Sequence, residues 1–327
     1  MNEMFVRLAR FGTVLALVVV TVGAWVRLTD AGLGCPDWPG CYGQLIVPEN
    51  HAAAERAFDG NYTDRPLEAD KAWREMIHRY LASGLGLVCV ALGALAWLNR
   101  RDPLQPRRVP FVLVGLVILQ GLLGMWTVTL LLKPIVVVAH LLGGLATLAL
   151  LASLGRWRLP AAVVFATPRL RALGVVAAGA LLVQIALGGW TSANYAAIAC
   201  PDFPTCQTQW WPAIADFEQG FVIWRGIGID YEGGVLDHPA RVAVHFAHRL
   251  GAIVAALLIG LFGWRLAREL PTRPDGVATL VVLLLQLSLG VSIVLFGVPL
   301  AVAVAHNGTA ALLLLTVLNA NQRIRQR

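Results

Sequence analysis

The chain has 327 residues, of which 57% are hydrophobic and only 14% are charged, and its mean hydropathy is +0.68. These values exclude a soluble globular domain and indicate a membrane protein with several spans. The formal net charge of +7 comes largely from arginines that cluster between hydrophobic segments. Membrane topology explains such clusters, so a nucleic-acid partner is not needed to account for them.

Eight stretches approach the roughly 20 apolar residues with which a helix crosses a lipid bilayer. In chain order, we expect these helices near residues 9–28, 75–98, 109–131, 135–155, 171–191, 241–266, 276–297 and 299–320. The first follows basic residues but has no Ala-x-Ala cleavage site, which favours a retained helix over a removed signal peptide. We also expect lids or short interfacial helices in the polar and aromatic segments 43–72 and 207–240.

Arginines lie near the N-terminus, in alternate loops between the predicted helices, and at the C-terminus. By the positive-inside rule, these loops and both termini face the cytoplasm. The two long segments 29–74 and 192–240 then lie outside.

Cysteine placement supports the same orientation. Cys35 and Cys41 share the first outer segment and Cys200 and Cys206 the second, and both pairs follow the pattern Cys-Pro-Asp-aromatic-Pro-x-Cys. Disulfides persist outside the cytoplasm, whereas zinc-binding cysteines are more often separated by two residues. We therefore expect one disulfide in each segment. The spacing leaves open whether either is redox active or only braces its loop.

The two halves of the chain repeat one pattern. Cys200 follows Cys35 by 165 residues, and His306 follows His140 by 166. Each half contains four predicted helices, an even number, so both halves enter the membrane in the same direction. We therefore predict an all-α polytopic membrane protein with two tandem four-helix bundles, residues 1–160 and 161–327, related by a pseudo-two-fold axis along the membrane normal.

Four histidines lie at matching places near the outer ends of predicted helices: His78 and His140 in the first half, His248 and His306 in the second. Two imidazoles at one depth on facing helices of a bundle can ligate a haem iron from both sides. A single intramembrane histidine can instead serve only as a hydrogen-bonding residue between helices. Two matched pairs favour two haem sites.

Charged residues next to the histidines suggest further roles. Arg79 and Arg249 directly follow His78 and His248, where they can bind haem propionates or extend to the membrane surface. Glu75 precedes His78 by three residues, on the same helix face, and His245 takes the corresponding place before His248. The first half can therefore use a carboxylate in proton chemistry, unless Glu75 simply faces water at the start of its helix.

In combination, these features resemble the haem A synthase family: the motif Glu75-Met76-Ile77-His78-Arg79, the two cysteine segments, the Gly-x-Trp ends of the first and fifth helices, and the helices of His140 and His306. The resemblance covers essentially the whole chain. It implies a haem b ligated by His248 and His306, a haem O substrate held near His78 and His140, and Glu75 as the acidic residue needed for catalysis. His245 is a second candidate ligand, but the His-Arg register shared with His78 favours His248.

The reaction that the resemblance implies oxidises one methyl group of haem O to a formyl group, through hydroxymethyl and hydrated aldehyde stages, and gives haem A for terminal oxidases. It also implies the cell inner (plasma) membrane as the location. Haem O supply by haem O synthase and a homo-oligomeric state are compatible with the sequence. The residues leave open the oxidant, the source of oxygen and the electron acceptor.

Two other classes of protein are alternatives to a haem A synthase. A di-haem b membrane cytochrome that only transfers electrons would use the same four histidines but would have no use for Glu75. A transporter or haem chaperone needs a polar path across the membrane, and the predicted helix centres offer little beyond Gln120, Gln184 and Gln286.

Overall fold

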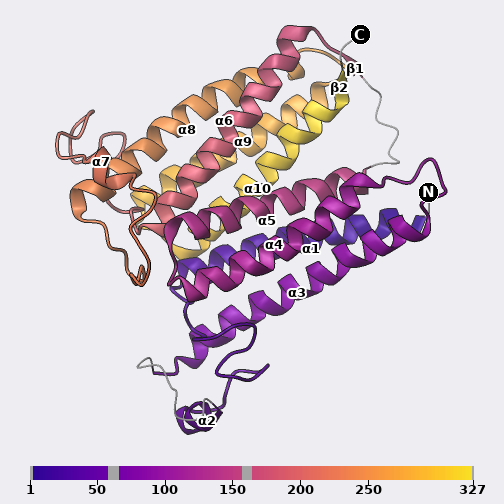
Figure 1. Cartoon of the computed structure of the whole chain (residues 1–327). Helices are drawn as coiled ribbons and strands as arrows, with labels where there is room; N and C mark the ends of the chain where they lie inside the picture. The colour runs from indigo at the N-terminus through magenta and orange to yellow at the C-terminus, as the bar shows by residue number, and fades with distance from the viewer. Residues whose placement is uncertain (1–2, 58–65, 157–163, 326–327) are drawn as a thin grey trace. The chain divides into compact units, whose positions relative to one another are not determined.

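The computed structural model describes residues 3–57, 66–156 and 164–325. Within these ranges, eight helices are long and apolar enough to span a membrane. Figure 1 shows them as α1 (Glu3–Leu28), α3 (Ala69–Leu98), α4 (Arg108–Thr129), α5 (Pro134–Gly155), α6 (Pro168–Ala193), α8 (His238–Ala267), α9 (Arg273–Leu295) and α10 (Leu300–Arg323). All eight predicted helices are confirmed, and the chain is a multi-pass membrane protein.

The smaller elements lie in the connections. The short helices α2 (His51–Ala57) and α7 (Phe217–Gly220) fall in the segments predicted to contain lids or interfacial helices. The two-residue strands β1 (Val164–Phe165) and β2 (Ile324–Arg325) pair in parallel. These strands are a small addition to the predicted all-α fold.

Helix α3 begins at Ala69, six residues before the predicted start at residue 75. Three of the six additional residues, Asp70, Lys71 and Arg74, are charged, so a search for apolar stretches does not detect this turn. This extension carries the helix beyond its apolar segment. Glu75 consequently lies within the second turn of a helix rather than at its first residue.

The chain divides into two compact units, and each contains one closed ring of four helices. In unit 1 (Met1–Trp157 and Ile223–Val235), α1 and α4 each pack against both α3 and α5. In unit 2 (Arg158–Val222 and Leu236–Arg327), α6 and α9 each pack against both α8 and α10. The packing order is therefore the same in both units. The assignment of one haem site to each predicted domain stays a prediction at this point.

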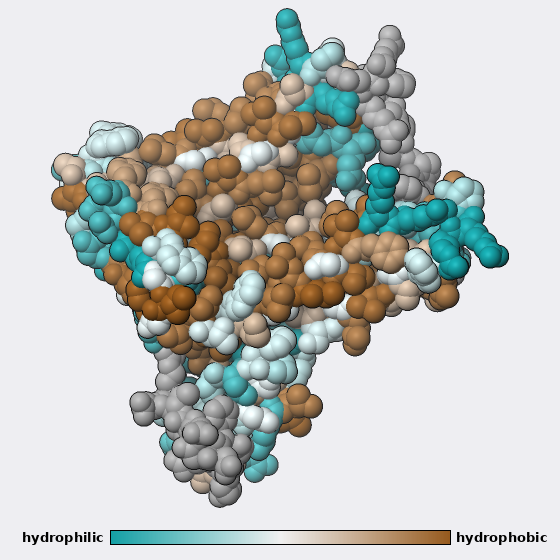
Figure 2. All heavy atoms as spheres, viewed as in Figure 1, coloured by the Kyte–Doolittle hydropathy of each residue, from teal (hydrophilic) through white to brown (hydrophobic). Residues whose placement is uncertain are grey.

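The outer helix surfaces are apolar. Figure 2 shows hydrophobic residues over the visible faces of the helices and hydrophilic residues near helix ends and loops. Large exposed side chains include Leu87 on α3, Leu257 on α8 and Leu284 on α9, which are 72%, 69% and 68% exposed. A soluble protein would rarely leave so much apolar surface in water. A lipid bilayer is the solvent that this surface fits.

Candidate haem sites and the Glu75 cluster

Each unit contains one pair of half-buried histidines on two of its helices. His78 on α3 and His140 on α5 lie close enough to interact electrostatically in unit 1. His248 on α8 and His306 on α10 do the same in unit 2. The structure thus brings together the four histidines in the two pairs that the repeat predicts.

Every one of these four rings rests on a glycine of a neighbouring helix. A Cβ atom added to the glycine would approach the imidazole Cε1 closely in each case: 2.9 Å for Gly23 and His78, 3.1 Å for Gly188 and His248, 3.6 Å for Gly124 and His140, and 3.0 Å for Gly290 and His306. The missing side chain therefore creates the space that each ring occupies. In the sequence, Gly23 and Gly188 appear only as part of the Gly-x-Trp ends of the first and fifth helices, which do not indicate this role.

These distances predict unequal effects of two alanine substitutions in unit 1. Gly23→Ala should displace the His78 ring, because atoms 2.9 Å apart overlap, whereas Gly124→Ala leaves an ordinary contact of 3.6 Å with His140. We expect Gly23→Ala to weaken haem binding by unit 1 at least tenfold, about 1.4 kcal/mol, and Gly124→Ala to change it little. Titration of the purified variants with haemin measures the difference. Equal affinities for both variants would contradict the glycine contacts described above.

Glutamine side chains hold three of the four imidazoles. The Gln120 amide is oriented so that both its nitrogen and its oxygen have hydrogen-bond partners. In this orientation its N–H donates to Nδ1 of His140 at 2.7 Å. Gln286 lies 3.1 Å from Nε2 of His306. Gln184 lies 2.9 Å from Nδ1 of His248. The few polar residues of the helix centres thus serve the histidines, which disfavours a polar transport path.

The histidine pairs fit a haem iron. Haem is commonly ligated by imidazole nitrogens in bundle cores, and each unit here brings two half-buried imidazoles together. Within the described part of the chain, Nδ1 of His78 and Nδ1 of His306 are buried without a hydrogen-bond partner. Two imidazoles in each unit are the kind of donor that a haem iron takes from a protein.

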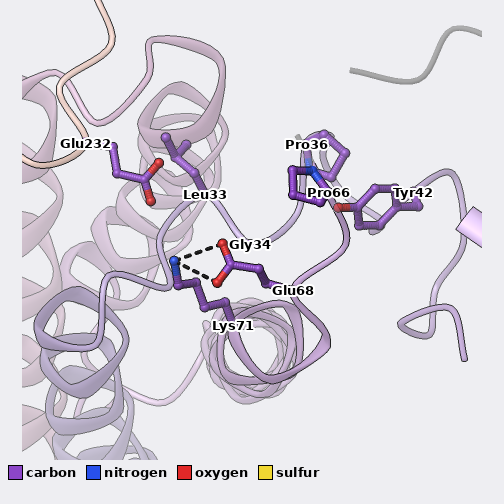
Figure 3. A pocket seen from close by; sticks show the side chains of 8 residues that line it. All are labelled: Leu33, Gly34, Pro36, Tyr42, Pro66, Glu68, Lys71 and Glu232. Atoms are coloured by element: carbon purple, nitrogen blue, oxygen red, sulfur yellow. Dashed lines mark hydrogen bonds and ion pairs between the residues drawn. The ribbon is translucent and has the colours of Figure 1, made fainter. Parts of the chain in front are cut away.

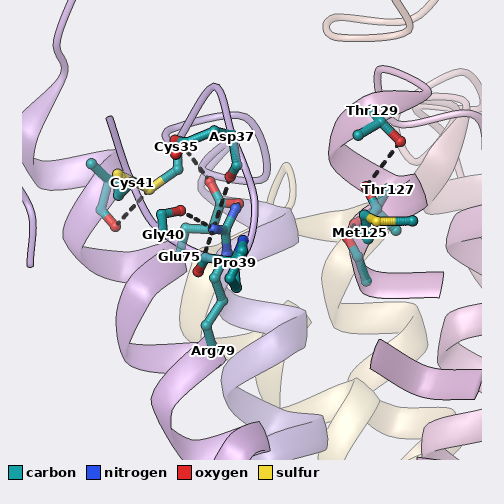
Figure 4. Close-up of polar contacts among 12 residues, drawn as sticks. Cys35, Asp37, Pro39, Gly40, Cys41, Glu75, Arg79, Met125, Thr127 and Thr129 are labelled. Carbon is teal, nitrogen blue, oxygen red and sulfur yellow. Dashed lines mark hydrogen bonds and ion pairs between the residues drawn. A yellow bond between two sulfur atoms is a disulfide. The ribbon is translucent and has the colours of Figure 1, made fainter. Parts of the chain in front are cut away.

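Glu75 lies in a buried polar cluster and does not face water, so that alternative is wrong. Its side chain is 7% exposed, and its Oε2 accepts a hydrogen bond of 2.9 Å from the backbone N–H of Cys35. Its Oε1 forms a 2.5 Å ion pair with Nη2 of Arg79. Figure 4 shows Arg79 reaching into the cysteine loop, where Nη1 donates to the carbonyl oxygens of Asp37, Pro39 and Gly40.

His245 is the structural counterpart of Glu75 in unit 2. Its Nδ1 lies 3.2 Å from the backbone N–H of Cys200, and its Nε2 lies 3.2 Å from Nε of Arg249. Both ring nitrogens therefore face N–H donors, although a neutral imidazole accepts only one hydrogen bond. Arg249 also donates to carbonyl oxygens of the second cysteine loop, at Cys200, Asp202 and Thr205.

The two arginines thus bind the cysteine loops. Their predicted contacts with haem propionates stay a prediction, because most of the hydrogen-bonding groups described for them are directed to backbone carbonyls. The 40 residues between Cys35 and Glu75 explain why sequence patterns did not reveal this cluster.

Both predicted disulfides are present. Cys35 is bonded to Cys41 and Cys200 to Cys206, with Cα–Cα distances of 4.8 and 4.7 Å. The zinc alternative is therefore wrong for these four residues. Cys89 is buried within α3 and forms no disulfide.

An aspartate side chain closes each of these loops. Asp202 accepts from the hydroxyl of Thr205 and from the backbone N–H groups of Gln207 and Thr208, the latter two at 2.8 and 3.0 Å. Slight burial opposes ionisation, but these hydrogen bonds outweigh it and hold the pKa of Asp202 below its usual value. The same pattern recurs at Asp37, which accepts from Tyr42 and Gly43.

The lowered pKa predicts that acid loosens the second loop. A carboxylate whose pKa is depressed by folding stabilises the folded loop above its unfolded pKa of about 3.9, and this contribution disappears as pH falls through the lower folded pKa. We expect reduction of Cys200–Cys206 by a water-soluble phosphine to accelerate below about pH 4. Asp202→Asn should show the faster rate already at neutral pH. A variant with the wild-type rate and pH profile would contradict this role.

A segment of the second half of the sequence, Ile223–Val235, belongs to unit 1 and is called the strap. The backbone N–H of Tyr231 donates to the carbonyl of Leu131 at 3.1 Å. Lys133, only 1% exposed, donates to the carbonyl of Gly226, and its Nζ lies 3.3 Å from the centre of the Trp224 ring. No sequence pattern indicated this strap.

The strap reaches a small pocket beside the first cysteine loop. Figure 3 shows Glu232 of the strap opposite Lys71, whose Nζ pairs with Glu68 at 2.9 Å. Gly34 and Tyr42 also line this pocket of about 110 Å³. A porphyrin needs several times this volume, so the pocket is not a haem site.

The fold and the site define a multi-pass membrane protein with two four-helix units, each holding a half-buried histidine pair. The cytochrome oxidase assembly protein family matches residues 7–318. Among similar proteins, the Heme A synthase of Shewanella oneidensis is 44% identical, with 96% of this chain and 94% of the relative covered. The chain belongs to the haem A synthase family.

More distant relatives carry the same name. The Heme A synthase of Rhizorhabdus wittichii is 31% identical, with 93% of this chain and 89% of the relative covered. That of Halalkalibacterium halodurans is 27% identical, with 94% and 93% covered. The similarity therefore extends over both units.

Proposed function

We propose that the chain is a haem A synthase, a membrane oxidoreductase that converts a ring methyl group of haem O to a formyl group. Haem O is the substrate of unit 1, where His78 and His140 bind its iron. A haem b is the resident cofactor of unit 2, held by His248 and His306, and it supplies electron transfer when bound. Membership of the family supports the reaction.

One observation carries the assignment of chemistry to unit 1. At the same place in two otherwise matched clusters, unit 1 has the carboxylate of Glu75 and unit 2 has the imidazole of His245. Glu75 and His245 each accept a hydrogen bond from the backbone N–H of the first cysteine of the loop. Each also contacts an arginine on its own helix, Arg79 or Arg249. Loop anchoring alone therefore does not require an acid, because His245 provides it. We therefore infer that the Glu75 carboxylate has a role in the reaction.

In this role, Glu75 exchanges protons near the reacting methyl group or stabilises positive charge that develops there. Arg79 fixes the orientation of the carboxylate through their 2.5 Å ion pair. Cys35 fixes the second oxygen through its backbone N–H. The disulfide braces the loop that supplies this donor. Three parts of the chain thus hold one proton-exchanging group in place.

The location follows the same proposal. Both termini then lie on the cytoplasmic side of the inner (plasma) membrane and the disulfide-bonded loops face outward, an orientation that the arginine clusters and the disulfides support. Haem O then reaches unit 1 from within the membrane, supplied by the enzyme that makes it.

A substitution taken from the chain itself tests the proposal. Glu75→His copies the anchoring group of unit 2, so the loop should stay attached while the acid is lost. The variant is expressed in a host that makes haem O but no haem A, and the extracted haems are separated by chromatography. We expect haem A from the wild type and unaltered haem O from Glu75→His, with Glu75→Gln giving the same loss.

Glu68→His is the matched control. Glu68 lies seven residues earlier, pairs with Lys71 at the surface, and has a side chain that is 56% exposed. Its substitution should leave haem A production near the wild-type level. Full haem A production by Glu75→His would reject the role of the carboxylate. Unaltered haems from the wild type itself would favour a di-haem cytochrome that only transfers electrons.

A further inference from the structure

The two units hold their first histidine differently. In unit 2, Nε2 of Gln184 lies 2.9 Å from Nδ1 of His248 and 3.0 Å from its carbonyl oxygen. Gly251, one turn further along α8, provides the space for this amide, because a Cβ at that place would overlap Oε1 of Gln184. A glutamine on one helix and a glycine on the next therefore form a single device around His248.

Unit 1 lacks both parts of this device. In the repeat, Gly188 corresponds to Gly23, and at the same offset Gln184 corresponds to Val19. His248 corresponds to His78, and at that offset Gly251 corresponds to Leu81. Val19 is buried and has no polar group to offer.

The consequence is visible at His78. Among the described residues, its Nδ1 is buried and has no hydrogen-bond partner. Two aliphatic residues thus stand in unit 1 where unit 2 has the amide and the glycine. His78 has no glutamine partner at Nδ1.

The second histidine of each pair shows no such difference in its partner. Gln120 contacts Nδ1 of His140 in unit 1, and Gln286 contacts Nε2 of His306 in unit 2, at corresponding places of the repeat. The ring nitrogen differs, but a glutamine is missing only at the first histidine of unit 1. Unit 2 has a glutamine at both histidines, and unit 1 has a glutamine at one.

A hydrogen bond to the distant nitrogen of an imidazole ligand fixes the ring and its tautomer and leaves the other nitrogen for the metal. Loss of such a partner typically lowers metal affinity by roughly 10- to 100-fold. Here the Gln184 N–H faces both Nδ1 and the carbonyl oxygen of His248. Iron binding through the other ring nitrogen requires a proton on Nδ1. The amide must then turn its carbonyl oxygen toward Nδ1 and give up the hydrogen bond to the His248 carbonyl, and the contact with the ring persists.

We propose that Gln184, with the space left by Gly251, is a positioning residue that retains the resident haem of unit 2. Val19 and Leu81 leave His78 unanchored, so that unit 1 releases its haem after oxidation. The inference rests on the proposed function, which requires one haem that stays and one that leaves. The same pair of helix positions sets the lifetime of the haem in each unit.

Haem transfer to apomyoglobin tests this proposal without any turnover. The purified full chain is loaded with haemin and mixed with excess apomyoglobin, and haem loss is followed by absorbance. The wild type should show one fast and one slow phase. Gln184→Val should accelerate the slow phase by about 10- to 100-fold, and Gly251→Leu should have the same effect by displacing the amide.

The reverse exchange tests the other unit. Val19→Gln combined with Leu81→Gly introduces the device into unit 1 and should slow the fast phase. Thr191→Val is the matched control, because it removes a buried hydrogen bond from α6 that does not involve His248. Its haem loss should match the wild type.

A second readout separates positioning from general stability. Without its Nδ1 partner, His248 is a less basic ligand and stabilises ferric iron less, so the midpoint potential of the slowly released haem should become more positive in Gln184→Val. Thr191→Val should leave this potential unchanged.

An unchanged slow phase and potential in Gln184→Val would overturn the proposal. If that variant fails to fold, an unchanged fast phase in Val19→Gln with Leu81→Gly would overturn it as well. Haem A production by the wild type is measured in parallel. Its absence would reject the proposed function, whatever the release rates show.

Discussion

Arg79→Ala is expected to abolish haem A production and to destabilise unit 1 by roughly 3–5 kcal/mol, the usual cost of leaving one charge of a buried pair without its partner. The side chains of Arg79 and Glu75 are only 12% and 7% exposed, so solvent compensates little for the loss. The substitution also removes the donor shared by the carbonyls of Asp37, Pro39 and Gly40. Extracted haems and the free energy of unfolding in mixed micelles are the measurements.

Two variants show which part of this loss is electrostatic. Arg249→Ala removes the same loop contacts in unit 2 but leaves the imidazole of His245, which can be neutral, so its destabilisation should be smaller. The double variant Arg79→Ala with Glu75→Ala removes both charges and should regain stability without regaining haem A. If Arg79→Ala and Arg249→Ala destabilise equally, loop attachment rather than charge burial explains the effect.

Hydropathy and spacing predict most of the frame of this protein. Apolar stretches locate all eight helices, because a bilayer leaves the backbone few alternatives to a helix. The cysteine spacing predicts both disulfides, since each pair is separated by only five residues. The start of α3 was predicted too late, because charged residues such as Asp70 and Lys71 continue the helix beyond the apolar stretch.

The contacts around Glu75 depend on tertiary structure and could not be predicted in the same way. The sequence shows Glu75 and His245 at corresponding places, but it does not show that both bind the N–H of a cysteine that lies 40 or 45 residues earlier. The glutamines Gln120, Gln184 and Gln286 appeared only as isolated polar residues within apolar helices. Their role becomes clear once packing places each of them against a histidine.

The strap shows the same limit at a larger scale. Residues 223–235 follow the second cysteine loop in sequence, yet Tyr231 and Lys133 join this segment to unit 1. A tandem repeat predicts two separate halves, and no charge or hydropathy pattern marks a segment that crosses from one to the other. Helix periodicity describes the two bundles well because their contacts repeat, whereas a single crossing has no periodicity.

His248→Ala is expected to remove the tightly bound haem, while His78→Ala is expected to retain it. His248 is one of the two imidazoles paired in unit 2, and its ring is positioned by Gln184 and by the space above Gly188. Loss of a ligand should cost at least the roughly 10- to 100-fold in affinity that loss of an outer hydrogen-bond partner costs. The haem content of the purified variant and its low-spin absorbance spectrum are the measurements.

The two variants should also separate the loss of haem A production from the loss of the resident haem. His78→Ala should keep the resident haem with its low-spin spectrum but produce little haem A, because the substrate loses a ligand in unit 1. His248→Ala should lose both, since the reaction needs the electron carrier as well as the substrate site. If His78→Ala loses the tightly bound haem and His248→Ala keeps it, the roles of the two units are exchanged. Glu75 would then stand beside the resident haem rather than beside the substrate, and the carboxylate would act on electron transfer instead of on the methyl group.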